Sequence, residues 1–150
     1  MANWKGAEYF NIILGEIPFT ELGNYLRETL GVRAETVKSS LFFNETDDTP
    51  VYADSFDLAG YLRNGKGFSL RVKAMQFDRE YRDVTALIYP NNDEADIDCD
   101  IAERNFDKKN LPALQEWLTA QVQSGAAGYA CINYTADTAP LFEIRRERLL

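Results

Sequence analysis

Residues 68–101, FSLRVKAMQFDREYRDVTALIYPNNDEADIDCDI, decide the fold of this chain. Polar and apolar residues alternate over 68–77, and a polar link leads to a second strand-like run at 82–89. Alternation with a period of two predicts a strand with one buried face, and two such runs joined by a short link predict an antiparallel hairpin. After a Pro-Asn-Asn turn at 90–92 the alternation resumes in ADIDCDI. We therefore predict three consecutive antiparallel strands.

The sequence on either side of this meander adds further strands. The segment NETDDTP at 44–50 is polar and rich in turn residues, so we predict a loop there. No internal repeat, low-complexity tract or linker divides the chain, and we expect residues 1–150 to form a single domain. Short apolar runs rich in β-formers predict the additional strands at about 9–14, 37–43, 129–134 and 141–146.

Three segments carry apolar residues at helical spacing. We expect the second of them to bury Phe56, Ala59 and Leu62 on one side. Strands and helices in this order are typical of an α+β fold, with a mostly antiparallel sheet of about six or seven strands and about three helices packed on one face. The first predicted helix spans 19–30 and ends at Gly31. The second begins at an N-cap, Asp54 or Ser55, and ends at Asn64, and the third begins at the N-cap Asn110 and ends just before Ser124.

Composition restricts the function classes. The 150 residues include no histidine, which removes histidine-based acid–base and nucleophilic catalysis and histidine metal sites. The net charge of −8 argues against a nucleic-acid or anionic-membrane partner, because both require a cationic footprint. No apolar run has the length of a transmembrane helix and the N-terminal residues make a poor signal peptide, so we expect a cytoplasmic protein.

The acidity is concentrated in two segments. The formal net charge of residues 91–107 is −6 and that of residues 44–57 is −5, which leaves a net charge of +3 for all other residues. Clustered like charges repel one another unless a base or a partner lies opposite them. We therefore interpret these segments as candidate contacts for a cationic partner.

Cys99 and Cys131 are the only cysteines. They are too few for a disulfide framework or for a zinc site, which needs about four ligands. Because both lie in apolar runs, we predict two buried free thiols, with a single structural disulfide as the alternative.

The motif Asp96-Ile97-Asp98-Cys99-Asp100 places three carboxylates on one face of a strand, about 6.6 Å apart. This stripe has three interpretations. In the first, the aspartates are solvated or paired across strands with Arg71 and Lys73, which share a predicted face with Met75. In the second, they form an interface for a basic partner. In the third, they hold divalent cations in a phosphoryl-transfer enzyme, although the Gly-Ser turn expected upstream in such an enzyme is missing.

A short acidic α+β chain with a focused acidic patch is similar in kind to immunity proteins and other inhibitors that occlude basic active sites, often those of nucleases. We therefore predict a bacterial toxin-neutralising protein, without catalytic residues, metal or cofactor, that binds a basic protein such as a nuclease toxin. Carboxylate-metal catalysis and a structural or assembly role are the alternatives. Exposed aromatics, of which Tyr52, Phe56 and Tyr89 are candidates, would anchor the partner. The predicted partner-binding residues are Asp93, Glu94, Asp96, Asp98, Asp100, Asp47, Asp48, Asp54 and Tyr52.

Overall fold

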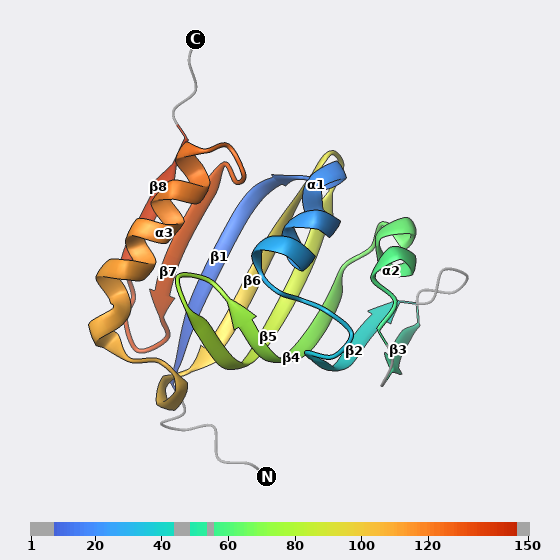
Figure 1. Cartoon of the computed structure of the whole chain (residues 1–150), viewed down its shortest axis with the longest axis horizontal. Coiled ribbons are helices and arrows are strands. Elements are labelled where there is room, and N and C mark those ends of the chain that lie inside the picture. Colours follow the sequence, from blue (N-terminus) through green and yellow to red (C-terminus); the bar gives the residue numbers. More distant parts are fainter. Residues whose placement is uncertain (1–7, 44–48, 54–55, 147–150) are drawn as a thin grey trace.

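The computed structural model describes residues 8–43, 49–53 and 56–146 of the chain (Figure 1). The strands within these residues are β1 (Tyr9–Pro18), β2 (Val37–Phe43), β3 (Pro50–Ala53), β4 (Phe68–Gln76), β5 (Glu80–Asn91), β6 (Glu94–Ala102), β7 (Tyr129–Tyr134) and β8 (Phe142–Arg145). The α-helices are α1 (Phe19–Asn24), α2 (Leu58–Asn64) and α3 (Leu111–Gln123). A π-helical segment, η1 (Tyr25–Thr29), continues α1, and two 3₁₀ turns, η2 (Glu103–Asn105) and η3 (Lys108–Asn110), precede α3.

The strands form one sheet in the order β3-β2-β4-β5-β6-β1-β7-β8, and all neighbouring pairs are antiparallel. The α+β prediction and the β4-β5-β6 meander are thereby confirmed. The described residues contain eight strands, slightly more than the predicted six or seven, because β3 occupies the end of the expected loop. β3 pairs only with β2 and begins at Pro50, a position where the missing backbone N–H of proline is tolerated at a sheet edge.

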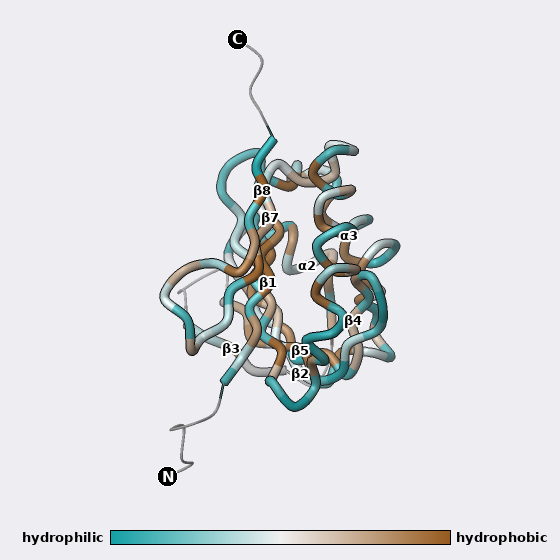
Figure 2. Tube along the Cα trace, turned by 90° about the vertical axis from the view of Figure 1, so that its left-hand side faces the viewer, coloured by the Kyte–Doolittle hydropathy of each residue, from teal (hydrophilic) through white to brown (hydrophobic). Residues whose placement is uncertain are grey.

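The three α-helices lie on one face of the sheet, as predicted (Figure 1). Figure 2, turned by 90°, shows α3 on one side of β1, β7 and β8. The strand residues that point toward the helices are apolar: Ile12, Ala86 and Cys99 face one another across three neighbouring strands, and each is at most 1% exposed. The core of the protein therefore lies between the sheet and the helices.

The predicted helix at 19–30 forms as α1 followed by η1. Leu22, Leu26 and Leu30 are fully buried, as their spacing predicts, and Gly31 ends the segment with a φ of 69°. The change from α-helical to π-helical hydrogen bonding at Tyr25 has no counterpart in the apolar pattern.

The second predicted helix begins later than expected. The N-cap is Asp57, whose side chain accepts a hydrogen bond of 3.1 Å from the backbone N–H of Gly60, whereas Asp54 and Ser55 lie outside the described residues. With this start α2 buries Leu58 and Tyr61, and Ala59 is exposed. Of the predicted inward residues, Phe56 and Leu62 pack partly buried against the core, and only the prediction for Ala59 was wrong.

The alternation of β4 and β5 also shifts before their connecting turn. Met75 is 1% exposed, and its Sδ lies 3.6 Å from the Sγ of Cys99, so its predicted outward direction was wrong. On the paired strand, Asp83 has a φ of 54°, and Val84 and Tyr81 on either side of it are both buried. The hairpin end thus turns its apolar side chains toward α3, where the Phe77 and Trp117 rings meet edge to face.

The C-terminal half agrees with the sequence pattern. α3 follows Asn110, carries Pro112 in its first turn and buries Leu114, Leu118 and Val122, which lie at helical spacing along one face. β7 spans the predicted residues, and β8 is slightly shorter than expected. None of the helices in the described residues is both long and apolar enough to cross a membrane.

Candidate functional site: the acidic strand face

The face of the sheet opposite the helices carries the predicted acidic stripe. Asp96, Asp98 and Asp100 belong to β6, which lies between β5 and β1 in the interior of the sheet. Their inward neighbours Ile97 and Cys99 are buried, as the alternation predicts. We call the surface formed by Glu94, Asp96, Asp98 and Asp100, with the outward side chains of the adjacent strands, the acidic strand face.

Asn11 on β1 holds two of these carboxylates. Its side-chain Nδ2 donates a hydrogen bond to the carboxylate of Asp98 and another, of 2.9 Å, to the Oδ1 of Asp100. Its Oδ1 accepts a hydrogen bond of 3.1 Å from the Nδ2 of Asn133 on β7. The two asparagines and two aspartates therefore form a hydrogen-bonded network across three strands.

Asp96 is held by the backbone instead. Its Oδ1 accepts a hydrogen bond of 2.9 Å from the N–H of Glu16, which has a φ of 55°. Glu16 lies where the β1–β6 register shifts, between Leu14 and Ile17. An irregular position of this kind leaves a backbone donor without a strand partner, and the Asp96 carboxylate supplies the acceptor.

The network has an electrostatic consequence at Asp98. Partial burial raises the pKa of its carboxyl above the usual value of 3.8, the hydrogen bond from Asn11 opposes that rise, and the negative charges of Asp100 and Asp96 add to it. Asp98 is half-buried rather than fully exposed, because the outward side chains of both neighbouring strands surround it.

The remaining predicted residues have different outcomes. Asp93 and Glu94 are exposed in and just after the β5–β6 turn, so the sheet brings them to one end of the acidic strand face. Tyr52 belongs to β3, at the sheet edge and separated from β6 by three strands, and its side chain lies outside the described residues. Asp47, Asp48 and Asp54 also lie outside the described residues.

Of the aromatic candidates with described side chains, only Tyr89 is available as an anchor. Tyr89 is 49% exposed and pairs across strands with Asp96. Phe56 packs against the core instead, with its ring edge-on to that of Tyr61 at a centroid distance of 6.0 Å.

The predicted cross-strand pairing of the stripe with Arg71 and Lys73 is not found. β5 separates β4 from β6, and Arg71 and Asp100 both lie opposite the intervening Thr85. Two strand spacings are about 10 Å, too far for direct contact between the paired backbones. Within the described residues no ion pair joins these bases to the stripe.

The two asparagines were not singled out from the sequence. Asn11 interrupts the apolar run YFNIIL, and Asn133 interrupts CINY. An amide inside a strand that is otherwise apolar requires hydrogen-bond partners, and this is the signal that could have identified both residues.

Cys99 and Cys131 are both free and buried, which confirms the predicted thiols, and the disulfide alternative was wrong. Burial raises the pKa of the Cys99 thiol, and the charges of Asp98 and Asp100 raise it further. The described residues contain no group of three or more aspartates, glutamates or cysteines arranged to hold a metal ion. Instead, the amide donor of Asn11 is bonded to both Asp98 and Asp100, which favours a fixed polar surface over a cation site.

Comparison with known proteins shows the fold. No family model matches the chain, and no curated protein matches it. Among solved structures, a chain from the crystal structure of the toxic C-terminal tip of CdiA from Pseudomonas aeruginosa in complex with an immune protein is similar, with a TM-score of 0.63 and 12% identity. The similarity covers 96% of this chain and 99% of that one. The chain thus shares its fold with a component of a toxin–immunity complex.

Proposed function

We propose that this chain is an immunity protein that binds a basic toxin domain through its acidic strand face. The observation that carries the proposal is the acidic strand face itself, where fixed carboxylates lie on the side of the sheet opposite the three α-helices (Figure 1). The fold similarity to a chain of a toxin–immunity complex supports the same class of function.

The geometry suits electrostatic recognition. Carboxylates on alternate residues of β6 are about 6.6 Å apart along the strand. Asn11 and the backbone of Glu16 already orient three of them, so little side-chain entropy is lost when a partner binds. Such a row of charges would accelerate the encounter with a basic surface and fix the register of the complex.

Tyr89 adds an apolar anchor. It is one of the two large hydrophobic side chains exposed in the described residues, and it lies beside Asp96. Tyrosine is among the residues that contribute most to protein–protein binding energy, because it buries a large ring at a low entropic cost. An anchor flanked by carboxylates matches a partner that combines basic side chains with an apolar pocket.

The proposed partner is a toxin domain with a positively charged active site, such as a nuclease. A site that binds phosphates presents lysine or arginine side chains, and the acidic strand face would occupy these groups as a phosphate backbone does. The partner would be blocked by occlusion, and this chain would need no chemistry of its own.

The test uses the chain and the toxic domain encoded beside its gene. We expect the chain to protect cells that express this domain and to form a 1:1 complex with it in calorimetry. D96N/D98N/D100N should weaken binding at least about tenfold and reduce the salt dependence of the association rate. The matched control, E35Q/E80Q/E116Q, removes the same charge from exposed positions elsewhere and should bind like the wild type.

Tyr89→Ala should weaken the complex by about tenfold without lowering the melting temperature, because the side chain is half-exposed. Leu141→Ala, at the other exposed large hydrophobic residue, is the control and should leave binding unchanged. Equal binding by both triple variants would contradict the proposed surface. Growth arrest caused by this chain on its own would assign it to the toxic side of such a complex.

A further inference from the structure

Arg71 and Lys73, which were expected to pair with the acidic stripe, are left without an acidic partner by the fold. Both are exposed on β4, and within the described residues neither takes part in an ion pair. The residues that alternate with them on β4 are buried, so both bases point to the side of the sheet opposite the helices. Arg71 lies in one cross-strand row with Thr85 and Asp100. The side of the sheet that carries the acidic strand face therefore carries unpaired positive charge as well.

Lys38 and Asp83 complete this cluster. The Nζ of Lys38 on β2 donates a hydrogen bond of 2.6 Å to the Oδ1 of Asp83, and in the β4–β5 register Lys73 falls opposite Asp83. The pKa of the Asp83 carboxyl is lowered by the hydrogen bond and the charge of Lys38, and further by the charges of Arg104 and Arg71. We call Lys38, Arg71, Lys73 and Asp83 the basic corner. Three bases around one carboxylate leave it with an excess of positive charge.

Arg104 on η2 is a neighbour of the basic corner rather than a member. It lines a separate hollow together with Arg82, and Glu80 and Asp107 in the same lining balance these two bases. The excess of positive charge therefore belongs to the basic corner itself.

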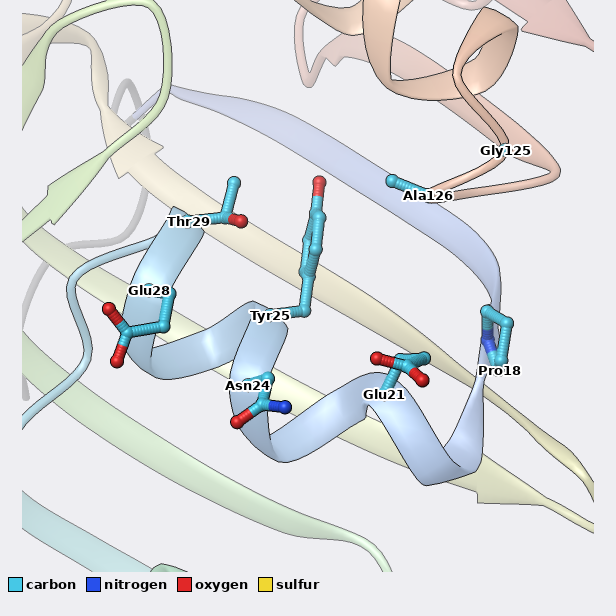
Figure 3. A pocket seen from close by; sticks show the side chains of 8 residues that line it. All are labelled: Pro18, Glu21, Asn24, Tyr25, Glu28, Thr29, Gly125 and Ala126. Carbon is cyan, nitrogen blue, oxygen red and sulfur yellow. The ribbon is translucent and has the colours of Figure 1, made fainter.

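Two bases beside the groove drawn in Figure 3 are, by contrast, held by the chain itself. This groove, of about 240 Å³, lies between η1 and the loop after α3. Asn24 in its lining accepts a hydrogen bond of 2.8 Å from Arg27, and the carbonyl of Gly125 accepts one of 3.3 Å from Arg146. The side chains of the two bases on β4 have no such partner within the described residues.

The surroundings of the basic corner restrict what it can bind. The hollow between Lys38, Arg71 and Asp83 measures about 20 Å³. It is too small for a small-molecule ligand, whose usual site is about 300–1,000 Å³. A nucleic acid is disfavoured, because Asp100 lies two strand spacings from Arg71, about 10 Å, and the acidic stripe repels phosphates. A single carboxylate on a protein surface can reach the exposed bases without meeting the stripe.

We propose that the basic corner binds an acidic side chain of the same toxin domain that the acidic strand face binds. This inference rests on the proposed function and adds that the partner is bipolar, with a carboxylate about 10 Å from its basic surface. An acidic row alone attracts any basic protein, whereas two adjacent charges of opposite sign fix the orientation and repel partners that are basic throughout. The basic corner is thus a determinant of specificity for the cognate toxin.

The test measures the association rate and the Kd of the chain with the toxic domain encoded beside its gene. R71Q/K73Q should slow association and weaken the complex by about fivefold. Its melting temperature should equal that of the wild type, because both side chains are exposed and take part in no ion pair within the described residues. The matched control, R63Q/K109Q, removes the same charge from exposed positions on α2 and η3 and should bind like the wild type.

The sign of the change decides the outcome. A partner that is basic throughout would bind R71Q/K73Q faster than the wild type, because the variant removes like-charge repulsion. Faster or unchanged association would therefore overturn the proposal. Asp83→Asn makes the basic corner more positive and keeps a residue that tolerates the φ of 54°, so it should bind faster than the wild type. Slower association of Asp83→Asn would also count against the proposal.

The same measurements separate this inference from the proposed function. If D96N/D98N/D100N weakens the complex and R71Q/K73Q does not, the acidic strand face is the binding surface and the basic corner plays no part in recognition. If the wild-type chain forms no complex with the toxic domain, the proposed function fails and this inference fails with it.

Discussion

The two faces of β6 show how one strand can serve two purposes. On the helix side, Ile97 and Ile101 are fully buried in the common core. On the other side, Asp98 and Asp100 share hydrogen bonds with Asn11. Because neighbouring residues point in opposite directions, a substitution at 97 and a substitution at 98 test different interactions on the same backbone.

The energetics of the two faces differ in kind. Complete burial of a side chain such as Ile97 contributes about 1.5–3 kcal/mol, and removing it also leaves a cavity. A hydrogen bond at a partly exposed position contributes about 0.5–1.5 kcal/mol, because water competes for the same groups. The helix side therefore contributes more to the stability of the fold than the acidic strand face does.

The largest effect is expected on the buried face. Ile97→Ala should lower the free energy of unfolding by about 3 kcal/mol, measured by urea denaturation. Asp100→Asn, three residues further along the same strand, keeps an oxygen that can accept the hydrogen bond from Asn11 and should change stability by less than about 1 kcal/mol. An equal loss of unfolding free energy in the two variants would show that the buried face does not stabilise the fold more than the acidic strand face.

Most of the buried face could be predicted from the sequence. The meander, α3 and β7 follow from local alternation or helical spacing, and the inward residues of β6 agree with the pattern. The position of β1 between β6 and β7 could not be predicted in this way, because it depends on pairing between distant segments. The shift at Met75 was missed as well, because the unusual backbone of Asp83 has no signature in hydrophobicity.

The candidate site was only partly predictable. The period of two identified the aspartates and their common face, but the partners of those carboxylates come from β1 and β7. Asn11 and Asn133, which bond to each other, are 122 residues apart in the sequence. Which polar residue meets which carboxylate depends on the strand order, so Arg71 was expected near the stripe where Asn11 is found.

An intermediate effect is expected for Asn11. Asn11→Ala removes the donor to Asp98 and Asp100 and the oxygen that accepts a hydrogen bond from Asn133, so stability should fall by about 1–2 kcal/mol. Asn11→Asp would add a third carboxylate to the pair and should cost more at neutral pH than in acid, because protonation of carboxylates removes their mutual repulsion. A loss for Asn11→Asp that does not depend on pH would argue against the electrostatic role of the amide.

The smallest effect concerns the ionisation of Asp98. Its pKa is raised in the folded protein above 3.8, mainly by partial burial, so folding favours the protonated carboxyl. The corresponding stabilisation is complete below the unfolded pKa and is lost as the pH rises through the folded pKa. At neutral pH the ionised group therefore opposes folding slightly, and Asp98→Asn should remove this penalty while keeping an acceptor for Asn11.

The melting temperature of Asp98→Asn should accordingly exceed that of the wild type by about 1–2 °C at neutral pH, a small gain because solvent screens a half-exposed charge. The difference should shrink as the pH falls through the folded pKa toward 3.8, since the wild-type carboxyl then becomes neutral too. Asp93→Asn, in the exposed turn, is the control and should show no such trend. A difference that grows on acidification would mean that the hydrogen bond from Asn11 outweighs the burial of Asp98, and that the folded state favours its ionised form.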